Sequence, residues 1–385
     1  MRFSYDLDRA LSRRGLAITV ATSDQVDLRY RTDKADEEID GITMRRYPNP
    51  SNYLAGRLQW LSYRPVGLRR AVIDLAAACD VVHVTEARGP HVRWAFAAAR
   101  AAGVPVVWSP LGGLAEGVGI RKPYRRLYDR VYRTRRLIGE ARAIVAQSVH
   151  EAAVLARLGA QPHQVRPIEL GVDASRFRAL PARGAFRRAA GFGERQPLVL
   201  FMGRFHPTKG LDVLMEAAAI ARRALPDLAV ALVGWDHGAL RTVRRRARAL
   251  RLEEAVRILP PLFGDFAVQA YVDADVFAVA ATLYEETSLA ALEALAAGTP
   301  CVLTRQCEVR GLQDMGGGQV TDCAPEAFAT GLLTVLEDPH RVARARSARR
   351  TILGSRTIEH SAEEYAAVFR GIAGVDAERP HHLAL

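Results

Sequence analysis

The stretch LVLFMGRFHPTKGLDVLMEAA, residues 198–218, decides the fold of this chain. It opens with the uninterrupted apolar run from Leu198 to Met202, which is typical of a strand buried on both faces of a parallel sheet. A polar loop runs from Gly203 to Gly210, and after it apolar residues recur at the spacing of one helix face: Leu211, Leu214, Met215 and Ala218. Strand, loop and helix in this order form the repeating unit of an α/β sheet.

The same alternation extends outward from this stretch along most of the 385 residues. Short apolar runs that we expect to be strands lie at Ala17–Thr22, Ile42–Arg46, Val81–Val84, Val104–Trp108, Ala143–Ala146, Leu198–Met202, Ala229–Val233, Val256–Leu259, Val276–Val279 and Cys301–Thr304. The polar, Arg-rich segment 179–196 divides them into two series. The sequence therefore predicts two similar doubly wound α/β domains, with the function in the cleft between them.

We place the first domain at residues 1–168 and the second at 169–356. A helix over 357–372 is expected to pack back on the first domain, and the polar tail 373–385 is expected to stay unordered.

Composition excludes a disordered chain, because 49% of the residues are hydrophobic and 25% are charged. No apolar run is long enough to span a bilayer and the N-terminus has no signal-peptide pattern, which together predict a cytoplasmic protein. The four cysteines form no CxxC pair and are expected to be reduced and buried, with no role as metal ligands: Cys79, Cys301, Cys307 and Cys323.

The formal net charge of +12 favours an anionic partner such as nucleic acid or a membrane surface. Only three of the 54 basic residues are lysines, so the arginine excess reflects codon bias as well as any selected surface. No recognised nucleic-acid-binding module accompanies the basic runs, and we expect no nucleic-acid partner. The segment RKPYRRLYDRVYRTRR, residues 121–136, is either a helix lying on an anionic membrane or a tyrosine stripe packed on the core.

The loop GRFHPTKG, residues 203–210, carries the first candidate site. Gly203 lets the backbone approach a ligand, and Arg204 and Lys209 bracket a strand end, where α/β proteins bind their ligands. An arginine fork and a lysine point charge together suit a diphosphate. The alternative is a solvated basic loop, but a lysine is a rare choice in this chain.

The second candidate site is EETSLAALEALAAGTP, residues 285–300. Thr287 or Ser288 is expected to cap a helix that Gly298 ends, and the free amides of Thr287, Ser288 and Leu289 favour a phosphate. Glu285 and Glu293 flank this helix start as acceptors for sugar hydroxyls. The alternative is one surface glutamate and one capping glutamate.

These motifs resemble the donor-binding signature of the retaining GT-B glycosyltransferases of family 4, and the resemblance covers almost the whole chain. The family's fold is two Rossmann-like doubly wound domains facing across a cleft. The turn ELGVDASRF at 169–177 is similar to the family's domain junction, and LPPLFGDFAVQAYVDADVFAVAATLYEE at 259–286 resembles the elements before its second motif.

The resemblance implies transfer of a hexosyl group from a nucleotide-diphosphate sugar to a saccharide or lipid-linked acceptor, with retention and without a cofactor. It gives catalytic roles to Arg204, Lys209 and Glu285, and donor-binding roles to Gly203, Thr287, Ser288, Leu289 and Glu293. Two residues depart from the family pattern: Leu111 replaces a histidine on the acceptor side, and Leu170 replaces an asparagine.

Other interpretations remain open at this stage. Asp273 and Asp275 form a DxD motif that in another glycosyltransferase class holds a metal, although an aspartate here also suits a helix end, and we expect no metal site. We expect a loop at Gly191 and Gly193 and a turn at the glycines 316–318. His83 is expected to be a core residue. The rival functions are a sugar-nucleotide epimerase, a nucleic-acid-binding protein and an inactive truncated homologue.

The first domain is expected to lack its first strand. Arg2–Gly15 reads as the helix that precedes the strand Ala17–Thr22, and a doubly wound sheet needs a central strand before that helix. We therefore expect no strand before residue 16 and a gap in the sheet, from either a misassigned start or a real truncation.

Overall fold

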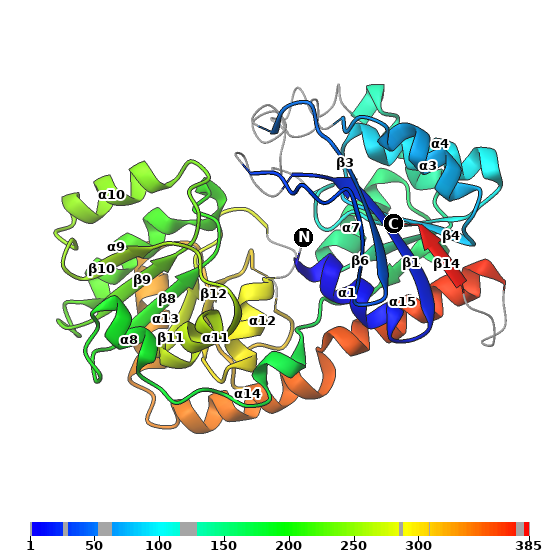
Figure 1. Cartoon of the computed structure of the whole chain (residues 1–385). Coiled ribbons are helices and arrows are strands. Elements are labelled where there is room, and N and C mark those ends of the chain that lie inside the picture. The colour runs from blue at the N-terminus through cyan, green and yellow to red at the C-terminus, as the bar shows by residue number, and fades with distance from the viewer. Residues whose placement is uncertain are drawn as a thin grey trace. The chain divides into compact units, whose positions relative to one another are not determined.

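The computed structural model describes residues 2–25, 30–52, 64–115, 129–284, 288–307, 309–374 and, for the backbone, 381–384. The chain folds into two compact units, one of Met1–Glu169 with Ile358–Leu385 and the other of Leu170–Thr357 (Figure 1). The boundaries expected from the sequence fall next to these. Each unit is a sheet of mostly parallel strands with helices packed on it, which is the fold class that the sequence predicts.

The sheet of the second unit is parallel throughout and has the strand order β10-β9-β8-β11-β12-β13. Its strands are β8 (Leu198–Met202), β9 (Ala229–Val233), β10 (Val256–Leu259), β11 (Val276–Val279), β12 (Cys301–Thr304) and β13 (Gly318–Thr321). Its helices are α8 (Ala185–Ala190), α9 (Leu211–Ala221), α10 (Leu240–Ala249), α11 (Gly264–Asp273), α12 (Leu289–Ala296), α13 (Pro325–Leu336) and α14 (Arg341–Ser355), with 3-10 turns η2 (Ala174–Phe177) and η3 (Pro207–Lys209).

The apolar pattern of residues 198–218 forms the centre of this unit. Residues 198–201 of β8 are buried, and α9 buries the face that the sequence predicts, including Leu211, Leu214, Met215 and Ala218. The prediction of a turn at residues 316–318 is wrong at Gly318, which begins β13. Gly318 has φ 135°, and a Cβ there would overlap the carbonyl of Cys301, so only glycine allows β13 to pair with β12.

The sheet of the first unit has the order β2-β3-β1-β14-β4-β5-β6-β7. Its strands are β1 (Leu16–Ser23), β2 (Asp36–Ile39), β3 (Ile42–Tyr47), β4 (Val81–Thr85), β5 (Val106–Ser109), β6 (Ala143–Ala146), β7 (Val165–Pro167) and β14 (His381–Ala384). Its helices are α1 (Arg2–Ser12), α3 (Leu68–Ala76), α4 (Pro90–Ala102), α6 (Thr134–Glu140), α7 (Val149–Leu158) and α15 (Ile358–Ala373), with the 3-10 turn η1 (Pro162–Gln164). Every pair in this sheet is parallel except β2 with β3.

Helix α15 packs against α1, and hydrogen bonds tie the two ends of the chain together. Arg14 donates from Nη2 to the carbonyl of Glu359 at 2.7 Å, and Arg370 donates from Nη2 to the carbonyl of Arg14 at 3.2 Å. On the covered side of α1, Asp8 is buried, and burial raises its pKa to about 8.

The C-terminal segment corrects two expectations. In the described chain α1 begins at Arg2 and the first strand begins at Leu16, as expected, but the sheet has no gap. Strand β14 runs parallel between β1 and β4, pairing Leu16–Thr19 with His381–Ala384 and Val81–Val82 with Leu383–Ala384 (Figure 1). The tail is therefore not wholly unordered, and a segment from the C-terminal end occupies the position between β1 and β4 where a gap was expected.

Candidate functional site

The loop between β8 and α9 carries both predicted cations at the carboxyl end of a central strand. Arg204 is exposed and Lys209 is half-buried, while Phe205 between them is buried. The amide of Phe205 donates to the carbonyl of Trp235 at 2.8 Å, which fixes the loop against the end of β9. Gly210 ends the loop with φ 59°, and a Cβ there would overlap the carbonyl of Ala280, so the backbone lies directly on the segment after β11.

A hydrogen bond joins the two candidate motifs. The amide of Thr282, after β11, donates to the carbonyl of Thr208 at 2.9 Å. Because β8 and β11 are parallel neighbours, their carboxyl ends lie at the same edge of the sheet. The structure therefore brings Gly203, Arg204 and Lys209 to the edge from which the chain leads into α12.

Helix α12 begins as the sequence predicts. Ser288 is its N-cap and accepts a hydrogen bond from the amide of Ala291 at 3.3 Å, so Leu289 opens the helix. The positive end of the helix dipole and the first amides of α12 thus follow the carboxyl end of β11 along the chain. Glu285 and Thr287 lie outside the described residues.

Glu293, in the second turn of α12, is held by side chains from two other segments. Its Oε1 accepts a hydrogen bond from Arg176 Nη1 at 2.8 Å, and its Oε2 accepts one from the hydroxyl of Tyr271 at 2.9 Å. Tyr271 is fully buried, and 13% of the Glu293 side chain is exposed. The carboxylate is therefore oriented and still reachable from solvent.

Two histidines that the sequence reasoning missed lie beside Arg204. Burial lowers the pKa of both His206 and His237, and the charge of Arg204 lowers both further. The charges of His237 and Lys209 also lower the pKa of His206, so four basic groups lie in one region. His206 lies within GRFHPTKG, so its place in this motif is the sequence feature that could have identified it as a site residue.

The DxD pair anchors the sheet to a preceding helix. Asp273 accepts hydrogen bonds from the amides of Gly184 and Arg187 at 2.6 and 3.0 Å, so it caps α8. Asp275 accepts from the guanidinium of Arg187 at 2.7 Å and from that of Arg183 at 2.6 Å. Protein groups therefore engage both carboxylates, which fits the helix-end interpretation.

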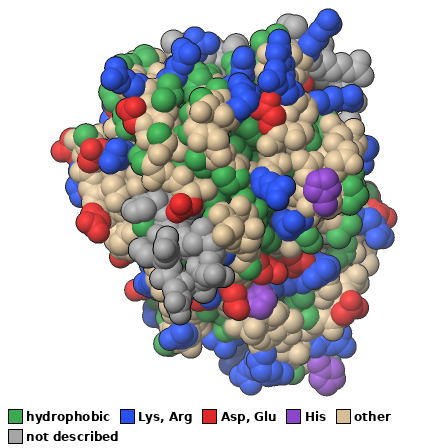
Figure 2. Space-filling model, turned by 90° about the vertical axis from the view of Figure 1, so that its right-hand side faces the viewer, with side chains coloured by type: hydrophobic (Ala, Val, Ile, Leu, Met, Phe, Trp, Pro, Cys, Tyr) green, Lys and Arg blue, Asp and Glu red, His purple; other side chains and the backbone are tan. Residues whose placement is uncertain are grey.

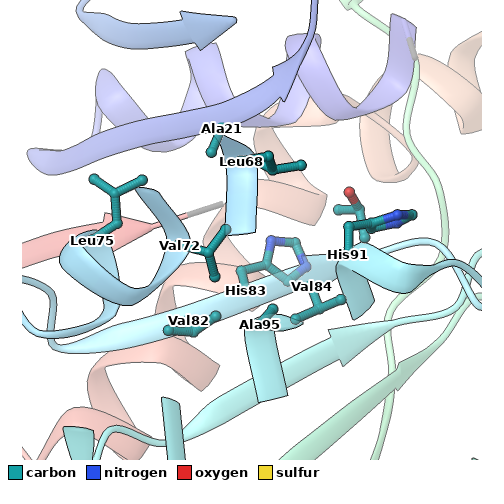
Figure 3. A pocket seen from close by; sticks show the side chains of 10 residues that line it. Ala21, Leu68, Val72, Leu75, Val82, His83, Val84, His91 and Ala95 are labelled. Carbon is teal, nitrogen blue, oxygen red and sulfur yellow. The ribbon is translucent and has the colours of Figure 1, made fainter. Parts of the chain in front are cut away.

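The first unit contains a cavity of about 80 Å³ between β1 and β4, along the direction in which β14 runs (Figure 3). Its walls are Ala21 of β1, residues 82–85 of β4, and side chains of α3 and α4: Leu68, Val72, Leu75, His91 and Ala95. Consecutive residues of one strand point to opposite faces, so a cavity lined by four of them runs along the strand edge. Ala21 and His83 lie beyond Thr19 and Val82, where the pairing with β14 ends.

His83 is a buried core residue, as expected. Its Nε2 shares a hydrogen bond with Ser109 Oγ at 2.9 Å, and Ser109 Oγ shares one with the hydroxyl of Tyr365 at 3.0 Å. Burial lowers the pKa of His83 to about 3, so the ring is neutral at physiological pH.

The loop SPLGGL has a fixed shape that depends on Glu151. Leu111, at the position of the family's histidine, has φ 52°, an uncommon left-handed conformation for a branched side chain. Glu151 accepts from the amide of Gly112 at 2.7 Å and from that of Gln147 at 2.9 Å. Glu151, in the first turn of α7, thus also holds this loop.

The proposed membrane helix is interrupted. Residues 121–128 lie outside the described residues, and Arg133 breaks the helical stretch that follows with φ 53° before α6 begins. A single helix through residue 136 is therefore wrong. On the face in Figure 2, lysine and arginine side chains lie in small groups among apolar and acidic ones. No helix in the described part of the chain has the length and apolarity needed to cross a bilayer.

Two family models match consecutive parts of the chain. The model "Glycosyl transferase 4-like domain" matches residues 2–171, and "Glycosyl transferases group 1" matches residues 182–351.

Among curated proteins, a D-inositol 3-phosphate glycosyltransferase of Catenulispora acidiphila is 34% identical over 249 residues, covering 60% of this chain and 55% of the relative. A protein of the same name from Mycobacterium sp. (strain KMS) is 32% identical over 264 residues, covering 66% and 54%. The chain spans about half the length of these relatives.

Solved structures share the fold at low sequence identity. Sucrose-phosphate synthase from Thermosynechococcus elongatus matches with TM-score 0.73 and 20% identity over 97% of this chain and 93% of that one. HepE of Anabaena, solved in complex with UDP-glucose, matches with TM-score 0.70 and 19% identity over 86% and 87%.

Proposed function

Because this chain belongs to the GT-B glycosyltransferases of family 4, we propose that it transfers a hexosyl group from a nucleotide-diphosphate sugar to an acceptor in glycan, polysaccharide or glycolipid synthesis. The second unit binds the donor. The acceptors to be tested are saccharides, lipid-linked sugars and inositol phosphates. Inositol phosphates are included because the names of similar curated proteins contain inositol 3-phosphate. The protein works in the cytoplasm or on the inner face of the membrane.

One observation carries the proposal: the hydrogen bond from Thr282 to Thr208, which joins the cationic loop after β8 to the segment that leads into α12. Two independent solvated loops would not require a backbone hydrogen bond between them. This hydrogen bond supports a shared diphosphate site at one sheet edge, in which Arg204 and Lys209 provide the cations and the start of α12 provides the amides.

The chemistry follows from this arrangement of charge. As the bond between the sugar's anomeric carbon and the diphosphate breaks, negative charge develops on the leaving phosphate oxygen. Arg204, Lys209 and the positive end of α12 stabilise that charge without a divalent ion. Glu285 contacts the transferred sugar, Glu293 accepts hydrogen bonds from the ribose hydroxyls, and the transfer retains the anomeric configuration.

The test is a reaction of the purified protein with UDP-, GDP- and ADP-hexoses, each with and without acceptors such as inositol 3-phosphate and simple sugars. We expect nucleoside diphosphate release that depends on the acceptor, and a product whose anomeric configuration, read by NMR, matches that of the donor. An epimerised sugar or sugar-nucleotide product formed without acceptor would favour an epimerase. Failure of every nucleotide to bind would refute the donor site.

A further inference from the structure

Glu293 is anchored through both of its carboxylate oxygens. Arg176 Nη1 donates to one oxygen at 2.8 Å, and the hydroxyl of Tyr271 donates to the other at 2.9 Å. The Arg176 side chain is 15% exposed, so this pair is largely withdrawn from water. A carboxylate held at both oxygens has one orientation, whereas a glutamate on a helix surface samples several rotamers.

The turn that carries Arg176 is itself rigid. Asp173 caps η2 by accepting hydrogen bonds from the amide and hydroxyl of Ser175 at 3.0 and 2.5 Å, and Phe177 is fully buried. Arg349 joins this turn to α12, because its guanidinium donates both to the carbonyl of Phe177 and to that of Ala296, the latter at 3.0 Å. The guanidinium of Arg176 is therefore fixed relative to the helix that carries Glu293.

The anchoring leaves Glu293 able to bind hydroxyls in defined directions. An ionised carboxylate offers about four lone-pair sites, and Arg176 and Tyr271 use one on each oxygen. A hydroxyl can approach through the 13% of the Glu293 side chain that is exposed, and the two donors determine how the carboxylate faces it. Two neighbouring hydroxyls of a ribose match two acceptor oxygens of one carboxylate.

We propose that Arg176 is a positioning residue for nucleotide recognition, which acts with Tyr271 by orienting Glu293 toward the ribose hydroxyls. The inference rests on the proposed function, since it requires that the second unit bind a nucleoside diphosphate. Arg176 does not itself touch the nucleotide. Its loss therefore lowers affinity only for ligands that carry the hydroxyls that Glu293 reads.

This role differs from a purely structural one in a measurable way. If Arg176 only ties η2 to α12, its removal lowers the melting temperature and weakens all nucleotides equally. If it orients Glu293, its removal weakens the ribonucleotide and leaves the deoxy analogue unchanged. The ratio of the two affinities therefore separates the two roles.

The experiment is calorimetry on the full chain with UDP, GDP and ADP, followed by the 2′-deoxy and 3′-deoxy forms of whichever nucleotide binds. We expect Arg176→Ala to weaken the ribonucleotide about tenfold, which is the loss of one oriented hydrogen bond, and to abolish the preference over at least one deoxy form. Arg178→Ala, an exposed arginine that follows the same turn, is the matched control and should behave as the wild type.

Two further variants keep the test decisive if Arg176→Ala folds poorly. Tyr271→Phe removes only a hydroxyl and should reduce the ribose preference in part, and Arg176→Ala added to Glu293→Ala should cause no further loss. An unchanged ribose preference in Arg176→Ala and Tyr271→Phe, or equal loss for ribo and deoxy forms, overturns the inference while the donor site stands. A wild type that binds no nucleoside diphosphate overturns the proposed function and this inference with it.

Discussion

The replacement of Asp8 by asparagine should stabilise the first unit at neutral pH. Asp8 lies on α1 with only 7% of its surface exposed, and burial raises the pKa of its carboxyl group from 3.8 to about 8. The folded chain therefore holds the proton at pH values at which the unfolded chain has released it. Asparagine has nearly the same shape and stays neutral at every pH.

The size and sign of the effect follow from these two pKa values. Below about pH 4 the carboxyl is protonated in both states and costs nothing. Between about pH 4 and pH 8 the unfolded chain binds fewer protons, so stability falls by about 1.4 kcal/mol per pH unit. At pH 7 the wild type has lost at most about 4 kcal/mol relative to the acidic limit, and Asp8→Asn recovers that loss.

Thermal unfolding of the wild type and Asp8→Asn between pH 4 and pH 8 measures this difference. The two melting temperatures should coincide near pH 4 and diverge as the pH rises, with the variant more stable. Asp6→Asn on the same helix is the control: it loses an ion pair with Arg9 and should be slightly destabilising at pH 7. A difference for Asp8→Asn that is independent of pH, or that shrinks as pH rises, would refute the reasoning.

Four other outcomes are expected. Lys209→Ala should weaken nucleoside diphosphate binding by about ten- to a hundredfold in calorimetry. The control Lys34→Ala removes an exposed cation paired with Glu37 and should leave binding unchanged. If Lys209→Ala binds as tightly as the wild type, the diphosphate assignment is wrong. Turnover should continue in the presence of a chelator. Loss of activity that only manganese restores would favour a metal site at Asp273 and Asp275. Binding to anionic vesicles should be weak, salt-sensitive and reduced when glutamine replaces Arg125, Arg126, Arg133 and Arg136; unchanged retention would exclude segment 121–136. Truncation after Gly374 removes β14 and should lower the melting temperature of the first unit by several degrees, and an unchanged value would show that the strand adds no stability.

The sequence by itself determined the elements whose signal is local. The strands at 198–202, 229–233, 256–259, 276–279 and 301–304 have the bounds that the sequence predicts. At 229–233 and 276–279 the reason is that a strand buried along its whole length needs an unbroken apolar stretch. The positions of Arg204 and Lys209 at a strand end, and of Ser288 as a helix cap, also follow from short-range patterns. Local propensity and motif spacing are enough where neighbours in sequence are neighbours in space.

Only the tertiary structure decided the features that depend on distant partners. The segment HHLA at 381–384 has no strand pattern of its own, and the two parallel edges of β1 and β4 make it a strand. Arg176 reaches Glu293 across 117 positions of sequence, so no spacing rule could pair them. Asp275 likewise pairs with Arg187, which is distant in sequence. The sequence alone showed only that Asp275 belongs to a DxD motif of the kind that can bind a metal. A hydrogen bond or ion pair needs two groups in one place, and only the folded chain brings these groups together.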